Sequence, residues 1–425
     1  MENEKNVLLI TYYWPPSGGA GVHRWLRFSN YFKENNCNLT VYCPHDAAWP
    51  AIDVNLNEEV SNDVTVIRRK IFEPNKFLQR GKKAGVGFTQ SKKQSFFQKV
   101  MIWVRGNLFI PDSRVFWIKP SARFLTIYLK NHPEITTIIS TGPPHSTHLI
   151  ALRLKEQFAV KWIADFRDPW TQIDFYSDLL PGKRADSKHR RLEKLVLQKA
   201  DEVVTVSNAC AEGLEEIAKR KIHVVTNGYN FPEFDKSTIE LDKDFTISHF
   251  GSMPFTRNPL VLWKALNKLI ETNNALSTQL KINLIGTVDY QVINSLKEYG
   301  LEKYVTIIPP IPHSESILLQ RSSQLLLLVA NNSGNVKGIL TGKFFEYLGA
   351  KRPIVAIGEK DSDLNVIVNR TECGCFVDYL DVETLIAFLN QSFIDYQNGN
   401  LSNVAVNTKE FSSSILVKKI IELVQ

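Results

Sequence analysis

The chain has 425 residues, enough for about two or three domains of roughly 100–200 residues each. Hydrophobic residues make up 44% of it and charged residues 22%, which excludes a fibre, a mini-protein and a wholly disordered chain. The net charge of +7 makes the protein mildly basic. Its five cysteines have no Cys-x-x-Cys spacing, which argues against a disulfide framework and a structural zinc site.

The first residues and the apolar runs indicate the cellular compartment to expect. Residues 1–6 carry two acids and precede a short apolar run, with neither the apolar core nor the cleavage site of a signal peptide. The longest purely apolar run elsewhere is 325–330, far short of the ~20 residues that span a bilayer. We therefore expect a cytoplasmic protein without a membrane-spanning helix.

Short β-branched runs bounded by turn residues predict strands throughout the chain. In the first half they lie at 6–13, 38–43, 64–69, 136–141, 160–165, 202–207 and 223–226. In the second half they lie at 245–251, 280–286, 305–309, 325–330, 353–358 and 375–377. Helical periods separate them, such as 21–35 and 146–157 in the first half, and 259–272, 290–299, 315–320, 342–349 and 382–390 in the second.

This alternation predicts an α/β protein with parallel sheets covered on both faces. A polar stretch at 229–244, with a proline and no strand pattern, interrupts it. We therefore expect two doubly wound, Rossmann-like domains, 1–230 and 245–409, facing each other across a cleft. The last segment, 410–425, predicts a helix with an apolar face that could pack back on the first domain.

Positive charge is concentrated between residues 68 and 123. Fourteen Lys and Arg there face only Glu73 and Asp112, and large apolar residues such as Trp103 accompany them. Basic residues with an amphipathic, aromatic stretch favour contact with an anionic membrane surface. A solvated basic loop before an ordinary core helix is the alternative. Nucleic acid is disfavoured because no recognised binding motif accompanies the charge.

Three loops of the first half follow predicted strands, where parallel sheets bind ligands. The first contains Gly18 and Gly19, whose lack of side chains lets the backbone approach an anion, although a plain tight turn explains them equally well. In the second, two prolines precede His145, which could also be a helix cap. The third contains Asp165, Arg167 and Asp168, which could also form a local salt bridge.

In the second half, Arg257 lies near a helix start, where a guanidinium suits a diphosphate. Gly342 and Lys343 open another helix, whose N-terminus favours anions. Glu346 lies one turn further on and could accept both hydroxyls of a ribose. The Asp-x-Asp pattern at 361–363 fits a loop better than a metal site, so we expect no metal.

Together these pieces resemble glycosyltransferase family 4, whose members have the two-Rossmann GT-B fold, and more loosely its bacterial surface-polysaccharide branch. The matching segments are 13–19, 142–149, 164–170, 206–207, 226–228, 250–252 and 342–348. The resemblance implies a metal-independent retaining transferase with its nucleotide sugar on the second domain and its acceptor mainly on the first.

Carried over to this sequence, the resemblance places Gly18 and Gly19 near the diphosphate and sugar. It assigns the diphosphate to Arg257 and Lys343. Glu346 then matches the second glutamate of the family signature and would bind the ribose.

The sequence departs from the family pattern at three positions. Gly338 stands where the first glutamate of the signature should be, and Ser252 where an arginine is common. The family's active-site histidine aligns with Arg167, with His145 as the substitute candidate.

The leading hypothesis is transfer of a hexose or N-acetylhexosamine from a UDP-sugar, or less favourably a GDP-sugar, to a surface-glycan or lipid-linked acceptor. The alternatives are a nucleotide-sugar epimerase on the same fold, a degenerate transferase that binds without turnover, and a simple two-domain binding protein.

Overall fold

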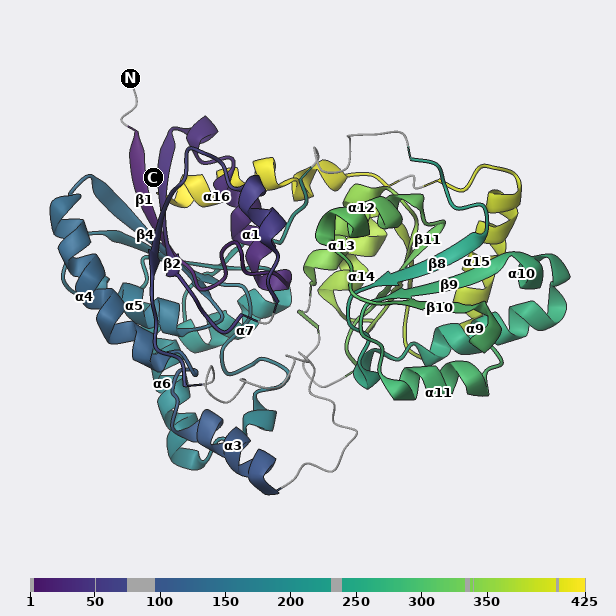
Figure 1. The fold of residues 1–425 in the computed structure, drawn as a ribbon, viewed down its shortest axis with the longest axis horizontal. Coiled ribbons are helices and arrows are strands. Elements are labelled where there is room, and N and C mark those ends of the chain that lie inside the picture. Colours follow the sequence, from purple (N-terminus) through teal and green to yellow (C-terminus); the bar gives the residue numbers. More distant parts are fainter. Residues whose placement is uncertain are drawn as a thin grey trace. The chain divides into compact units, whose positions relative to one another are not determined.

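The computed structural model describes residues 4–49, 51–74, 96–230, 239–332, 337–338, 340–402 and 405–424. The chain divides into two compact units (Figure 1). Unit 1 comprises Met1–Thr226 together with Ser413–Gln425, and unit 2 comprises Asn227–Ser412. The chain thus leaves unit 1, forms unit 2, and returns to unit 1 with its last helix.

The described residues of unit 1 form a parallel seven-stranded sheet in the order β3-β2-β1-β4-β5-β6-β7. Its strands are β1 (Lys5–Ile10), β2 (Cys37–Pro44), β3 (Thr65–Arg69), β4 (Ile135–Gly142), β5 (Lys161–Phe166), β6 (Glu202–Thr205) and β7 (His223–Val224). All seven strands predicted from the sequence are confirmed, with ends displaced by a few residues. The strand order reverses between β1 and β4.

Both faces of this sheet are covered, because alternate residues of each strand point to opposite sides. Leu8 and Ile10 face one core, and Val7 and Leu9 face the other. The first core is closed by α4 (Val115–Asn131), α5 (Ser146–Lys155), α6 (Lys183–Lys199) and α7 (Asn208–Ala218). The second is closed by α1 (Ala20–Ser29) and α16 (Ser413–Val424). A further helix, α3 (Phe96–Asn107), packs against α6.

Unit 2 repeats this architecture with six parallel strands, in the order β10-β9-β8-β11-β12-β13, within its described residues. They are β8 (Phe245–Phe250), β9 (Leu280–Ile285), β10 (Val305–Ile308), β11 (Leu325–Val329), β12 (Ile354–Ile357) and β13 (Gly374–Val377). One face packs on α9 (Leu260–Thr272), α10 (Asn274–Gln279), α11 (Tyr290–Glu298) and α15 (Val382–Gln397). The other packs on α12 (His313–Ser322), α13 (Gly342–Ala350) and α14 (Asp363–Thr371). The predicted pair of doubly wound sheets is confirmed.

In unit 2 the strand order reverses between β8 and β11, and their ladder ends early. The paired residues stop at Ser248 and Leu326, although β8 continues to Phe250. Beyond that point Tyr347 from α13 fills the gap, and its hydroxyl accepts a hydrogen bond from the Phe250 amide at 3.1 Å. Ligands of doubly wound sheets bind at the carboxyl edge near such a reversal, so this edge is where a site is expected.

Candidate functional site

The carboxyl edge of the unit 2 sheet is built on two glycines in close contact. Gly251, just after β8, has a positive φ of 96°, and its amide donates to the Ile285 carbonyl at 2.6 Å. Gly286, just after β9, has a φ of 136°, and a Cβ there would lie 2.2 Å from the Gly251 carbonyl oxygen. A side chain at position 286 would clash with the Gly251 backbone, and the positive φ at position 251 favours glycine, so the two strand ends pack backbone against backbone.

Lys343, in the first turn of α13, reaches over this backbone. A Cβ on Gly251 would lie only 2.4 Å from the Lys343 Nζ, so the lysine occupies the space that the glycine leaves. Burial, together with the charge of Arg257, lowers the pKa of Lys343 to about 7. Arg257 comes from the short helix Phe255–Arg257, and its Nε donates to the Asn331 side chain at 2.7 Å.

Two cationic side chains thus lie near the N-terminus of α13, where Gly342 is the first helical residue. The first amides of a helix have no partner within it and favour an anion. The Thr341 hydroxyl, at the N-cap, is buried and makes no hydrogen bond to the described residues. The arrangement is chemically suited to a phosphate or diphosphate.

Glu346 follows one turn later on α13 and is buried. Its Oε1 lies 3.2 Å from the Nε2 of His313, the first residue of α12. The sequence prediction included Glu346 but missed His313, because nothing in the local pattern around 313 distinguishes it from a solvent-exposed helix start.

His249, near the end of β8, was also missed. It is 2% exposed, and its Nδ1 lies 3.0 Å from the Leu327 carbonyl oxygen, so this nitrogen must carry the proton. Burial and the nearby Lys343 charge lower the pKa of His249 to about 3, which leaves the ring neutral. Its Nε2 is buried without a partner among the described residues. Only the unusual placement of a histidine in an apolar strand could have signalled it.

The Asp-x-Asp segment has local partners. Asp361 lies 3.8 Å from the Lys337 ammonium, and the Asp363 amide donates to the Lys337 carbonyl. Within the described ranges, no group of three or more His, Cys, Asp or Glu side chains could hold a metal ion.

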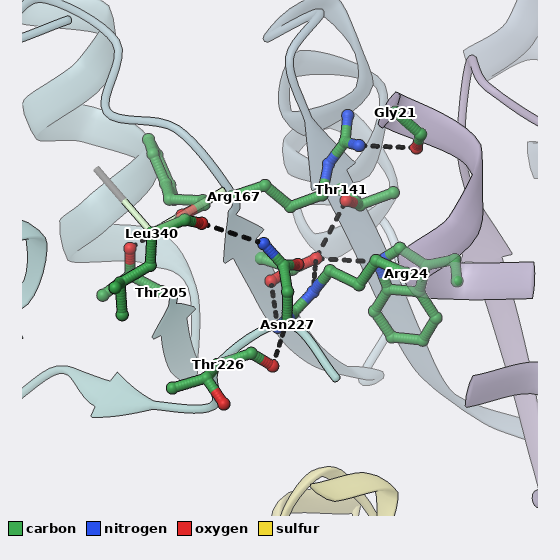
Figure 2. A network of polar contacts seen from close by, with 11 residues as sticks. Gly21, Arg24, Thr141, Arg167, Thr205, Thr226, Asn227 and Leu340 are labelled. Atoms are coloured by element: carbon green, nitrogen blue, oxygen red, sulfur yellow. Dashed lines mark hydrogen bonds and ion pairs between the residues drawn. The ribbon is translucent and has the colours of Figure 1, made fainter. Parts of the chain in front are cut away.

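In unit 1, Asp165 from β5 is fully buried and belongs to a polar network, of which Figure 2 labels Arg24, Thr141 and Thr226. Its carboxylate accepts hydrogen bonds from Arg24 Nη2 at 3.0 Å, Trp25 Nε1 at 2.7 Å and Thr141 Oγ1 at 2.9 Å. Arg24 also donates to the Thr226 carbonyl at 2.8 Å. The network joins α1 to β4, to β5 and to the point where the chain leaves unit 1.

Arg167, two residues further on, is held by two carbonyls. It donates to Gly21 and to Pro143, both at 2.6 Å, and its guanidinium lies 5.7 Å from the centre of the Tyr13 ring. Figure 2 shows its side chain turned toward Gly21 at the start of α1. Asp168, the next residue, is exposed.

His145 is buried and stacks on Trp170, with ring centres 4.6 Å apart and planes parallel within 1°. Burial and the neighbouring His148 hold the pKa of His145 well below its usual range, so the ring is neutral. Its Nδ1 has no partner in the described chain and lies 3.0 Å from where a Cβ on Gly142 would be.

The glycines after β1 are Gly18, which is buried and donates to the Ala51 carbonyl at 2.9 Å, and Gly19, the N-cap of α1. Gly19 has a φ of 88°, a conformation that favours glycine.

The predicted residues therefore fall into two groups. Six lie in unit 1, either within β5 near its end or in the loops after β1, β4 and β5: Gly18, Gly19, His145, Asp165, Arg167 and Asp168. Arg257, Gly342, Lys343 and Glu346 lie in unit 2, around α13 and the loop after β8.

The basic segment 68–123 carries an exposed aromatic cluster, which we define as Phe72, Phe109 and Phe116. Phe116 packs on both other rings, at 5.6 Å and 5.9 Å, and Phe72 and Phe116 are 57% and 48% exposed. Residues 75–95 lie outside the part of the chain that the structure describes, and they include four lysines of the basic segment, Lys82, Lys83, Lys92 and Lys93. No described helix has the length and apolar character needed to cross a membrane.

No protein-family model and no curated protein matches the chain. Solved structures do match it. Sucrose-phosphate synthase from Thermosynechococcus elongatus is 14% identical, with a TM-score of 0.62 over 99% of this chain and 98% of that one.

Two further structures match at 10% identity. A TarM variant of S. aureus, in complex with fondaparinux, α-GlcNAc-glycerol and UDP, gives a TM-score of 0.59 over 99% of this chain and 100% of that one. A Listeria monocytogenes protein described as a UDP-N-acetylglucosamine 2-epimerase gives a TM-score of 0.55 over 98% of this chain and 95% of that one. At these identities the likeness shows the fold, and that fold is GT-B.

Proposed function

We propose that this protein is a retaining glycosyltransferase that moves a hexose or N-acetylhexosamine from a nucleotide-diphosphate sugar, UDP in preference to GDP, to a surface-glycan or lipid-linked acceptor. Unit 2 binds the donor, and unit 1 contributes most of the acceptor site. The observation that carries the proposal is the cationic pair Lys343 and Arg257 beside the N-terminus of α13, with the Glu346 carboxylate one turn away.

These groups match the parts of a nucleotide diphosphate. The ammonium, the guanidinium and the free amides of α13 complement the phosphate oxygens, and the carboxylate can accept hydrogen bonds from the ribose hydroxyls. In the reaction, the bond from the sugar C1 to the diphosphate oxygen breaks and a bond from C1 to the acceptor oxygen forms. The acceptor proton passes to the leaving diphosphate. Stabilising that departing charge is the contribution of Lys343, Arg257 and the helix amides.

The unit 1 residues divide by their surroundings. Asp165 is surrounded by donors and acts as a positioning residue rather than a proton carrier. Arg167 and Asp168 lie at the strand end, where an acceptor hydroxyl would approach, and the neutral His145 adds a nitrogen, Nδ1, without a partner among the described residues.

Nucleotide binding tests the donor half of the proposal. UDP and GDP affinities are measured by calorimetry with EDTA present, for the wild type, K343M and, as a matched control, K264M, an exposed lysine on α9. We expect UDP to bind and K343M to weaken it at least tenfold, with K264M unchanged. Equal weakening by both lysine variants, or no nucleotide binding, contradicts the proposal.

A nucleotide-sugar epimerase is the second candidate, favoured by the fold likeness to the Listeria protein. An epimerase converts the donor sugar without any acceptor. Incubating the protein with UDP-sugars alone and analysing the sugar by NMR separates the two: a changed C2 configuration supports the epimerase and argues against transfer.

We further propose that segment 68–123 contacts an anionic membrane surface. The exposed aromatic cluster supplies apolar groups, and Lys70, Lys119 and Arg123 lie nearby in sequence and are exposed. F72S/F116S is expected to weaken binding to phosphatidylglycerol vesicles. The control I127S removes an equally exposed apolar residue from elsewhere on α4 and should bind normally. Equal vesicle binding by all three proteins contradicts the membrane role.

A further inference from the structure

Glu346 does not stand alone at the nucleotide site of unit 2. His313 begins α12, directly after Pro312, and α12 packs against α13. The two side chains are largely enclosed, 15% exposed for His313 and 11% for Glu346, and their Nε2 and Oε1 atoms are 3.2 Å apart.

The chemistry of this contact fixes the roles of the atoms. An ionised carboxylate only accepts hydrogen bonds, so the proton lies on the His313 Nε2. This holds whether the imidazole is neutral or charged. The bond uses one of about four acceptor positions on the two carboxylate oxygens.

The bond also restrains the carboxylate. A glutamate side chain has three rotatable bonds, and a carboxylate enclosed to this degree is costly unless it is hydrogen-bonded. Donation from His313 offsets that cost and holds Oε1 toward α12. The carboxylate is thereby oriented before any ligand arrives, which reduces the entropy lost on binding.

We propose that His313 is a positioning residue that orients the Glu346 carboxylate to accept both hydroxyls of a vicinal diol, the ribose of the nucleotide donor. This inference rests on the proposed function, because it requires Glu346 to meet the ribose. It adds a second element, the start of α12, to the groups that govern nucleotide affinity.

The test compares two ligands that differ only in the diol, UDP and 2′,3′-dideoxy-UDP. Affinities for both are measured by calorimetry for the wild type, H313A, H313Q and E346A. H223A is the matched control, because His223 forms a similar histidine–glutamate contact with Glu202, at 2.9 Å in unit 1. Circular dichroism and melting confirm that each variant is folded.

We expect H313A to weaken UDP roughly tenfold, the loss typical of a hydrogen bond to a charged group, and to leave dideoxy-UDP within about twofold. H313Q, whose amide can donate to Glu346, should recover most of the UDP affinity. H223A should bind both ligands as the wild type does.

Two patterns overturn the inference alone: H313A weakens both ligands equally, or H313A changes neither while E346A lowers UDP affinity selectively. A different pattern points to the proposed function itself. If the wild type binds neither UDP nor GDP, or if E346A leaves the preference for the diol intact, the assignment of this edge to a nucleotide fails.

Discussion

Lys343 is the single residue whose ionisation bears most directly on ligand binding. Its pKa of about 7 in the free protein is set by burial and by the charge of Arg257. A bound diphosphate favours the ammonium form and therefore raises the pKa of Lys343 in the complex. Between the two values, binding takes up a proton, so affinity is highest at low pH and falls as pH rises.

We therefore expect UDP affinity to decrease by up to tenfold per pH unit from about pH 7 upward, until the pKa of the complex is passed. Calorimetry in two buffers of different ionisation enthalpy measures both the affinity and the proton uptake. K343M should show a flat profile over this range. A wild-type affinity that is constant above about pH 7 would show that Lys343 does not contact the diphosphate.

Sequence reasoning reached some residues of the site and missed others for a physical reason. Gly342, Lys343 and Glu346 share one helix, so their spacing alone indicates a common site. His313 meets Glu346 across 33 positions, and Asp165 meets Arg24 across 141. Such contacts depend on how distant elements pack, which a single sequence does not encode locally.

At the scale of elements, the Asp165 network is a buried polar contact between α1 and the unit 1 sheet, beside their shared apolar core. Removing the negative charge leaves Arg24 buried without its counter-ion, a change that costs about 3–5 kcal/mol. We expect D165N to lower the free energy of unfolding of unit 1 by about that amount, measured by urea denaturation. If D165N is as stable as the wild type but loses turnover, Asp165 has a catalytic role instead.

The contact between Gly251 and Gly286 in unit 2 can be tested by comparing two glycine substitutions. G286A would drive a Cβ into the Gly251 carbonyl, so the loop beneath Lys343 must shift. Gly300 also has a positive φ, of 68°, but nothing lies within 4 Å of its Cβ position. Both substitutions strain the backbone, yet only G286A should weaken UDP binding, by tenfold or more. If calorimetry gives G286A and G300A the same affinity for UDP, the contact between Gly286 and Gly251 is not part of the nucleotide site.

The strands were predictable because their signal is local in the sequence, whereas the contacts of the site join distant residues. The thirteen predicted runs lie in two sheets that helices cover on both faces, and the central strands of such sheets are largely apolar runs between turn residues. The sequence prediction gave no bounds for the helices α4, α6, α7, α10 and α14, and α6 shows why. Its only buried residues are Ala185, His189, Glu193, Val196 and Leu197, so its inward face includes a histidine and a carboxylate.

The whole molecule has separate apolar cores in its two units, so each unit should contribute its own unfolding transition. Ile420 on α16 is fully buried in a core of unit 1. I420A should cost about 2–5 kcal/mol and lower the unit 1 transition in calorimetry. UDP should raise the other transition. A shift of the UDP-sensitive transition by I420A would contradict this assignment.

The return of the chain to unit 1 has a consequence for biosynthesis. The core shared by β1 and α16 needs Leu416, Val417 and Ile420, which are translated only after all of unit 2. Unit 2 is contiguous and can fold as it emerges from the ribosome. Unit 1, although its sheet is made first, must wait with this face only partly covered, by α1, until the last helix is released. The nascent chain therefore presents that face to chaperones for the time it takes to synthesise an entire second domain.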